Sequence, residues 1–454
     1  MERKNAWLTY NDSDKQALER LSADFRHFLD EAKTERECVS KTIELAKAHG
    51  YADLAEAGEL HPGDKVYASY MDKTIALFTI GSEEPEEGMN ILCAHIDSPR
   101  LDVKQNPLYE DSGFALLDTH YYGGIKKYQW VTIPLAIHGV VCMKDGTRVE
   151  VIIGEKESDP VVGITDLLVH LAQDQMEKKA RLVIDGEDLN VLVGSKPVEE
   201  GKETVKEGIL SILKDNYDID EEDFLSAELE IVPAGKARDF GLDRSMVIGY
   251  AQDDRVCAYT SLVSMLECEF PKKTACCLLV DKEEIGSVGA TSMRSMFFEN
   301  TVAEVLHACG VDGDLALRRC LARSAMLSSD VGAGFDPNYP SVFDKKNCSF
   351  LGHGVVFHKF TGSRGKGGSN DANAEYIAQI RQIMDDAGVC WQTAELGKVD
   401  VGGGGTIAFI AALYGMQVID SGIPVLCMHA PWEISSKADI YEAKKCYDAF
   451  LKRV

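Results

Sequence analysis

The sequence predicts an α/β domain that is interrupted by a β-rich insertion. Strand-like apolar runs alternate with helical stretches near the beginning and the end of the chain, a pattern typical of a sheet covered by helices. Between about residues 105 and 245 the chain is richer in short strands. With 454 residues it is well above the roughly 100–200 expected per domain, so it has room for both parts.

The first 50 residues are expected to be helical. Leu18, Leu21 and Phe25 recur at helical spacing, and Gly50 is placed to end a second helix over residues 38–49. Three strand-like runs follow, and the third is apolar enough to be a buried central strand. These runs span residues 65–70, 74–80 and 89–97.

Residues 106–244 are assigned to the inserted domain, and residues 1–105 together with 245–454 to the main domain. Within the insertion a turn at Asp145–Gly146 separates two β-rich stretches, and a helix is expected over residues 164–179. From residue 246 strands and helices alternate again. The expected strands are 276–280, 325–331, 354–360 and 423–430, and the expected helices are 372–387, 407–414 and 438–451.

Composition excludes several classes of partner. The 74 acidic and 48 basic side chains give a net charge of −26, which repels nucleic acid and anionic lipid. No run approaches the roughly 18 apolar residues of a membrane span, and the first residues lack the apolar stretch of a secretory signal. The thirteen cysteines are scattered through apolar segments without CxxC spacing. We therefore expect a cytoplasmic protein with reduced thiols and neither nucleic-acid nor membrane partners.

Acidic and imidazole side chains stand at the ends of several apolar strands, where ligands bind in open α/β sheets. His95 and Asp97 end the run 89–97, and Asp97 could orient the imidazole because residues i and i+2 of a strand point the same way. Glu283 and Glu284 follow the apolar run 276–280. One could bind a metal while its neighbour acts as general base toward a water. The structural alternative for His95 and Asp97 is a surface or capping arrangement, and that for Glu283 and Glu284 is a solvated acidic turn.

Three further positions complete the pattern. Asp330 lies where an apolar strand opens into a glycine-containing loop, and His429 lies at another strand end. Taken alone, each motif favours a structural explanation: an Asx-turn or helix cap for Asp330, and a partly buried imidazole with its hydrogen bonds satisfied for His429. Asp253 and Asp254 precede a helix, whose dipole alone could account for both, although they could also bridge two cations.

Together these residues form a plausible ligand set for two divalent metal ions. His95, Asp253, Glu284, Asp330 and His429 supply two imidazoles and three carboxylates. The set suits zinc, with Glu283 left as the base, while carboxylate-rich ligation also suits Mn²⁺ or Co²⁺.

Two glycine-rich loops are candidates for substrate binding. VGGGGT at 401–406, which includes Gly404, lacks the GK[ST] of a phosphate loop, but its N–H groups could meet a substrate carbonyl or carboxylate. A plain structural turn is the alternative. GSRGKGGSN at 362–370 carries Arg364 and Lys366, which could bind a substrate carboxylate unless the segment is only a connecting loop.

These motifs match a known family over nearly the whole chain. The sequence resembles the aspartyl aminopeptidases, cytosolic dizinc exopeptidases, and in particular their bacterial branch. The individual motifs are unspecific, but their order is highly specific. They are CAHIDSPRLDVK, IPLAIHG, AQDDR, VDKEEIGSVGATSM, SSDVGAGFDPNY, GGGGTIA and MHAPWEISSKADI.

The resemblance implies a zinc-exopeptidase-like α/β/α catalytic domain with a mixed sheet, and it assigns roles to the site residues. His95 and His429 would be terminal ligands on opposite metals, with Asp253 as the bridging carboxylate between them. Glu284 and Asp330 would complete the two coordination shells, Asp97 would support His95, and Glu283 would be the general base. AQDDR stands where eukaryotic members carry an RLDN-like stretch, so Asp254 is the alternative bridge.

The resemblance further implies that the β-rich insertion is a dimerisation domain and that dimers assemble into a tetrahedral dodecamer. His138 is the position expected to reach a neighbouring active site. The expected activity is release of N-terminal residues from peptides, with Asp and Glu as candidate side chains. A related dizinc amidase or deacylase, and a catalytically silent assembly subunit, are the rival interpretations.

Overall fold

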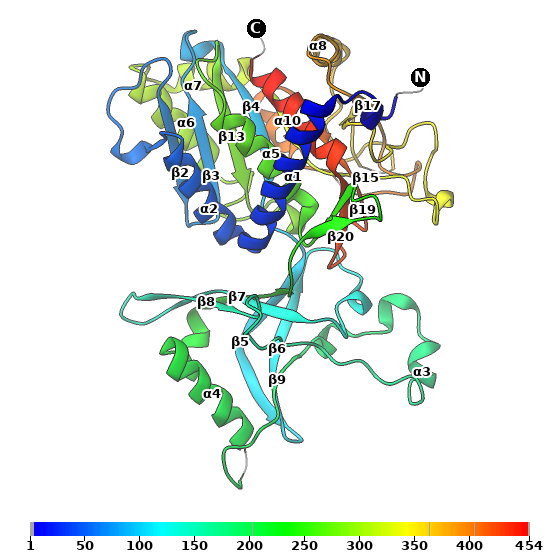
Figure 1. Cartoon of the computed structure of the whole chain (residues 1–454). Helices are drawn as coiled ribbons and strands as arrows, with labels where there is room; N and C mark the ends of the chain where they lie inside the picture. The colour runs from blue at the N-terminus through cyan, green and yellow to red at the C-terminus, as the bar shows by residue number, and fades with distance from the viewer. Residues whose placement is uncertain (1–3, 202, 363, 404, 453–454) are drawn as a thin grey trace. The chain divides into compact units, whose positions relative to one another are not determined.

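The computed structural model describes residues 4–201, 203–362, 364–403 and 405–452. The chain divides into two compact units (Figure 1). The first contains the residues up to Asp97, Ala237–Met428 and the residues from Glu433 on; the second contains Ser98–Lys236 and residues 429–432. The long segment of the second unit therefore begins and ends eight residues earlier than the expected 106–244, because the strand that starts at Arg100 belongs to its sheet and the strand that starts at Arg238 does not.

A nine-stranded mixed sheet forms the centre of the first unit, which confirms the expected α/β class. Its strand order is β1-β2-β3-β13-β4-β14-β18-β16-β17. The four strands β13, β4, β14 and β18 are parallel neighbours, and β4 and β13 are buried along their whole length, as expected for central strands. The strands are β1 (Ala52–Asp53), β2 (Lys65–Tyr70), β3 (Thr74–Thr79), β4 (Met89–His95), β13 (Thr274–Val280), β14 (Ala325–Ser329), β16 (Val355–His358), β17 (Trp391–Thr393) and β18 (Gln417–Gly422).

Helices cover both faces of this sheet. Alternate residues of β4 enter different cores: Leu92 and Ala94 pack with α1, α2, α5, α8 and α10, whereas Ile91 and Cys93 pack with α6, α7 and α9. Figure 1 shows α1, α5 and α10 on one side of β4 and β13, and α6 and α7 on the other. The helices are α1 (Asp12–Glu31), α2 (Glu35–Ala48), α5 (Gln252–Leu266), α6 (Phe297–Ala308), α7 (Asp314–Arg323), α8 (Ala374–Asp386), α9 (Ala408–Ala411) and α10 (Lys437–Leu451).

A second, five-stranded sheet in the first unit organises the segments that leave the central strands. Its order is β11-β12-β20-β19-β15. Its strands come from three parts of the chain: the segment just after β14, the segment just before α5 and the segment just before α10. Its strands are β11 (Arg238–Phe240), β12 (Met246–Gly249), β15 (Gly332–Ala333), β19 (Pro424–Leu426) and β20 (Glu433–Ser436).

The second unit is built on a six-stranded sheet in the order β8-β7-β10-β5-β6-β9, with helix α4 (Thr204–Tyr217) packed against it. Each strand of this sheet is antiparallel to its neighbours. The strands are β5 (Arg100–Asp111), β6 (Phe114–Tyr122), β7 (Leu135–Cys142), β8 (Arg148–Ile153), β9 (Val191–Gly194) and β10 (Ala227–Pro233).

The helix expected over residues 164–179 is wrong. Only the single turn α3 (Gln173–Met176) forms there. The preceding backbone is tied to strands instead, because Leu135 N–H donates to Val162 O and Leu192 N–H to Gly163 O, each at 2.8 Å. An amphipathic helix also needs a surface on which to bury its apolar stripe, and the leucines of this segment are exposed.

None of the helices described here is both long and apolar enough to cross a membrane. All thirteen cysteines are free thiols, as expected, and most of them are buried.

Candidate metal centre

The candidate site lies at the carboxyl ends of three adjacent parallel strands. β4 lies between β13 and β14, and His95 is the last residue of β4. Glu283 and Glu284 begin the short 3-10 helix η8 (Glu283–Ile285) after β13, and Asp330 directly follows β14. Because parallel neighbours end at the same edge of a sheet, residues distant in sequence meet here, as the strand-end argument predicted.

His95 is at the centre of the cluster and is 1% exposed. Its Nδ1 lies 3.0 Å from the carbonyl oxygen of Asp97, and its Nε2 lies 3.3 Å from Asp253 Oδ1 and 3.9 Å from Asp330 Oδ1. Burial alone would lower the pKa of His95, but the carboxylates of Asp253 and Asp97 raise it well above its usual value. The ring is thus oriented with one nitrogen on the backbone and the other toward two carboxylates.

Asp97 connects the histidine to the acidic pair. Its carboxylate accepts the backbone N–H groups of Glu283 and Glu284, each at 3.1 Å, and its Oδ1 lies 3.4 Å from His95 Nδ1. The expected support of His95 is therefore shared between the carbonyl and the carboxylate of Asp97. The same carboxylate also holds the turn that carries the candidate base.

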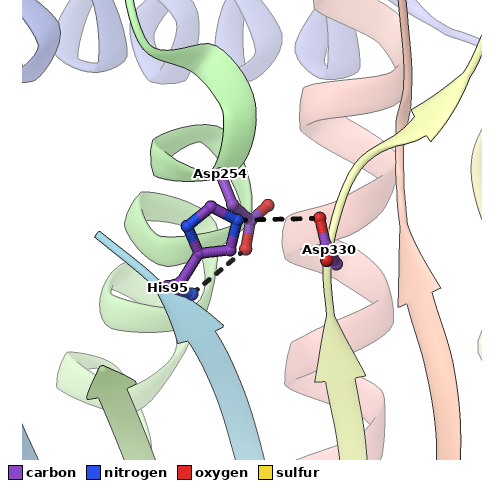
Figure 2. Close-up of side chains that lie close together, drawn as sticks. All are labelled: His95, Asp254 and Asp330. Atoms are coloured by element: carbon purple, nitrogen blue, oxygen red, sulfur yellow. Dashed lines mark hydrogen bonds and ion pairs between the residues drawn. The ribbon is translucent and has the colours of Figure 1, made fainter. Parts of the chain in front are cut away.

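Asp253 and Asp254 lie at the start of α5, where the backbone is not helical and their shared peptide bond is cis. Asp254 is fully buried and accepts the backbone N–H of His95 at 3.3 Å. Figure 2 shows His95 with Asp254 and Asp330 around it, drawn from β4, the start of α5 and the end of β14. Both aspartates therefore belong to the cluster.

The cluster concentrates negative charge in a buried place. Burial, together with the charges of Asp254, Asp253 and Glu283, raises the pKa of Asp330 well above its usual value, and burial together with Asp253 does the same for Asp254. A divalent cation would relieve this repulsion.

The donor atoms also suit a metal. In the group His95, Asp253 and Glu284 one donor atom from each residue lies within 4.8 Å of the others, and the same holds for His95, Asp254 and Asp330. Imidazole nitrogen and carboxylate oxygen are donors that zinc accepts. These residues therefore fit a metal ion.

Two of the expected site residues lie in the second unit. His429 adopts a left-handed backbone with φ 64°, and its Nδ1 lies 2.9 Å from Gly124 O. His138 lies in β7, is 2% exposed, and has its Nε2 3.1 Å from Glu155 Oε1. Neither residue belongs to the groups of close donor atoms described above.

The two glycine-rich loops touch each other. A Cβ at Gly405 would lie 1.8 Å from Gly368 O, so only glycine allows this contact. Arg364 is exposed, whereas Lys366 Nζ lies 2.9 Å from Asp371 Oδ2. Gly404 lies outside the described residues.

Two buried acids near the cluster were not predicted. Asp420, in β18, accepts a hydrogen bond from Thr406 of the VGGGGT loop, and burial raises its pKa to about 7, with a further contribution from Glu283. Glu433, in β20, accepts the backbone N–H of Asp253 at 2.9 Å. The strand-end signal used for Asp330 does not indicate Asp420, because β18 continues for two residues beyond it.

Comparison with known proteins gives a consistent result. Residues 28–451 match the family described as aminopeptidase I zinc metalloprotease (M18). A probable M18 family aminopeptidase 1 from Clostridium acetobutylicum is 61% identical over 99% of this chain and 98% of its own length. The aspartyl aminopeptidase of Caenorhabditis elegans is 24% identical over 96% of each chain.

Solved structures agree. The crystal structure of aminopeptidase I from Clostridium acetobutylicum is 60% identical, with a TM-score of 0.93 over 99% of both chains. That of the M18 aminopeptidase from Thermotoga maritima is 43% identical, with a TM-score of 0.97 over all of both chains.

Proposed function

Because the chain belongs to the M18 family of zinc aminopeptidases, we propose that its catalytic metals bind at the His95 cluster and that Glu283 is the general base. The observation that carries this proposal is the convergence of one imidazole and several carboxylates at the ends of β4, β13 and β14 and at the start of α5. The enzyme is a metalloaminopeptidase, and its substrates are peptides with a free N-terminus.

The proposed ligands for two zinc ions are His95, Asp253, Glu284, Asp330 and His429. Asp253 is favoured over Asp254 as the shared ligand, because its Oδ1 lies 3.3 Å from His95 Nε2. Asp254 uses one oxygen to accept the His95 backbone N–H. The place of His429 in this set rests on the family resemblance.

Zinc bound at this cluster would act as a Lewis acid, lowering the pKa of a water and polarising the peptide carbonyl. Glu283 would take the proton from the attacking water and return it to the leaving amine. Asp97 would keep Glu283 and Glu284 in fixed positions by accepting both of their backbone N–H groups. Arg364 would offer a positive charge to an acidic N-terminal side chain.

Substitution Glu283→Gln tests the assignment of the base. It removes the proton acceptor but keeps the shape of the side chain, so kcat on aminoacyl substrates should fall by about 100-fold or more. Zinc content, measured by elemental analysis, should stay at the wild-type value. Near-wild-type turnover would contradict the role of Glu283, while loss of zinc would show that Glu283 is itself a ligand.

We further propose that the second unit mediates assembly into dimers and dodecamers in the cytoplasm. The solved structure of yeast aminopeptidase 1, which has the same fold at 20% identity, is described as a dodecamer. On this chain several large apolar side chains of one segment are exposed and would be buried by a second copy. They are Val161, Leu167, Leu168, Val169, Leu171 and Met176.

A mixing experiment tests assembly and the role of His138 together. If His138 acts in a neighbour's active site, inactive His138→Ala and Glu283→Gln variants should complement each other after subunit exchange. After full exchange of equal amounts, half of the dimers would be mixed and one of the two sites in each mixed dimer would have both groups, so about one quarter of all sites should regain activity. Light scattering after chromatography gives the oligomer mass. Absence of regained activity in exchanged mixtures would contradict the role of His138 in a neighbouring site.

A further inference from the structure

The backbone that carries Asp253 is held by a second buried carboxylate. Asp253 has φ −80° and ψ 105°, so it interrupts the helical geometry at the start of α5. N–H groups in the first turn of a helix have no partner within the helix. The N–H of Asp253 donates instead to Glu433 Oε2 at 2.9 Å, and Glu433 is only 1% exposed.

The neighbouring residue ties the same turn to the same strand. Gln252 is fully buried, and its Nε2 donates to the carbonyl oxygen of Glu433 at 2.6 Å. Its side-chain oxygen is hydrogen-bonded to the hydroxyl of Ser435. Strand pairing sets Gly249 opposite Glu433. The segment from Gly249 to Asp253 therefore contacts β20 through its backbone and through the side chain of Gln252.

We propose that Glu433 is a positioning residue of the metal centre: its carboxylate holds the Asp253 backbone so that Asp253 Oδ1 faces His95 Nε2. The proposal rests on the proposed function of Asp253 as a ligand. What the contact requires is an acceptor oxygen at this distance from β20, which a glutamate or a glutamine side chain can supply. Groups that orient metal ligands in this way typically change metal affinity by about 10–100-fold when they are removed.

Two substitutions separate the contact from the charge. Glu433→Asp keeps the charge but shortens the side chain by one methylene, so the bond to Asp253 N–H is lost. Glu433→Gln keeps the length and an acceptor oxygen but removes the charge. Zinc affinity of the metal-free full chain is measured by competition with a chromophoric chelator. We expect zinc binding to weaken by about 10-fold or more in Glu433→Asp, and to stay within about threefold of wild type in Glu433→Gln, because its oxygen can still accept the Asp253 N–H.

Glu442→Asp is the matched control. Glu442 is also fully buried and also accepts a backbone N–H, from Cys390 at 2.6 Å, but it is not part of the cluster. This variant should lower the thermal unfolding temperature and leave zinc affinity unchanged.

Three outcomes would overturn the inference: wild-type zinc affinity in Glu433→Asp, equal weakening in Glu433→Gln, or equal weakening in the control. Wild-type zinc affinity in His95→Ala would instead refute the location of the metal centre, and the inference with it. The two failures are therefore distinguishable.

Discussion

His358 should make the first unit sensitive to acid. The imidazole ends β16 and is 4% exposed. Its Nδ1 lies 2.9 Å from Ala394 O, and its Nε2 has no hydrogen-bond partner among the residues that the structure describes. Protonation would add a buried charge and an N–H donor without an acceptor. Burial accordingly lowers the pKa of His358 to about 4.

The magnitude follows from linkage between protonation and folding. In the unfolded chain the imidazole takes up its proton near about pH 6.5. Between about pH 6.5 and 4 the unfolded chain binds a proton that the folded chain does not, so the free energy of unfolding falls as the pH falls. At about 1.4 kcal/mol per pKa unit the full loss is about 3 kcal/mol. About 2 kcal/mol of it should be lost between about pH 7 and pH 5.

The assay is urea unfolding of the metal-free protein at both pH values, followed by tryptophan fluorescence. Wild type should lose about 2 kcal/mol more than His358→Gln on acidification, since the carboxyl groups are common to both. His307→Gln provides a control of opposite sign. Asp312 raises the pKa of the exposed His307, so wild type gains stability there as the pH falls and the variant does not. Equal pH dependence in wild type and His358→Gln would refute the reasoning.

Three further outcomes are expected. Asp253→Asn should lower zinc content, measured by elemental analysis, whereas Asp254→Asn should leave zinc bound, because only Asp253 is the proposed shared ligand. Equal zinc loss in both variants would contradict that choice. Asp97→Ala leaves two backbone N–H groups without their acceptor and should lower kcat by about 10–100-fold while the chain stays folded by circular dichroism. Gly405→Ala would bring a Cβ to 1.8 Å from Gly368 O, so its thermal unfolding temperature should fall; an unchanged value would show that the two loops do not touch in solution.

Long periodic elements could be predicted from the sequence because their burial pattern is local. The apolar run 89–97 became the central strand β4, which ends at His95, and the helical spacing near Leu18 became α1. Helices α6 and α7 were not predicted; neither begins with a residue whose side chain caps it, and their N-caps are Met296 and Gly313. The helix expected over residues 164–179 does not form. Most of its apolar residues are exposed rather than packed against another part of the chain, so burial of an apolar face does not stabilise a helix there.

The sequence could predict which residues of the candidate site lie at strand ends. It could not predict which side chains bind the backbone around them. Acids and histidines at strand ends could be grouped, because parallel strands end at one edge. The prediction for Asp97 assumed that the strand continues to residue 97, so that side chains i and i+2 point the same way. β4 instead ends at His95, and the carboxylate of Asp97 turns to the backbone of Glu283 and Glu284.

The contact between Asp97 and the backbone of Glu283 and Glu284 links the acidic pair to His95. One carboxylate positions the backbone of both glutamates and contacts the ring of His95, so the candidate base and two candidate ligands share one support. Glu433 supports Asp253 through the same kind of contact, an acid accepting a backbone N–H. Asp97 and Glu433 both accept backbone N–H groups, and a contact to the backbone cannot be predicted from the pattern of side chains. Residue identities could therefore suggest the ligands, but only the folded backbone reveals the carboxylates that hold them.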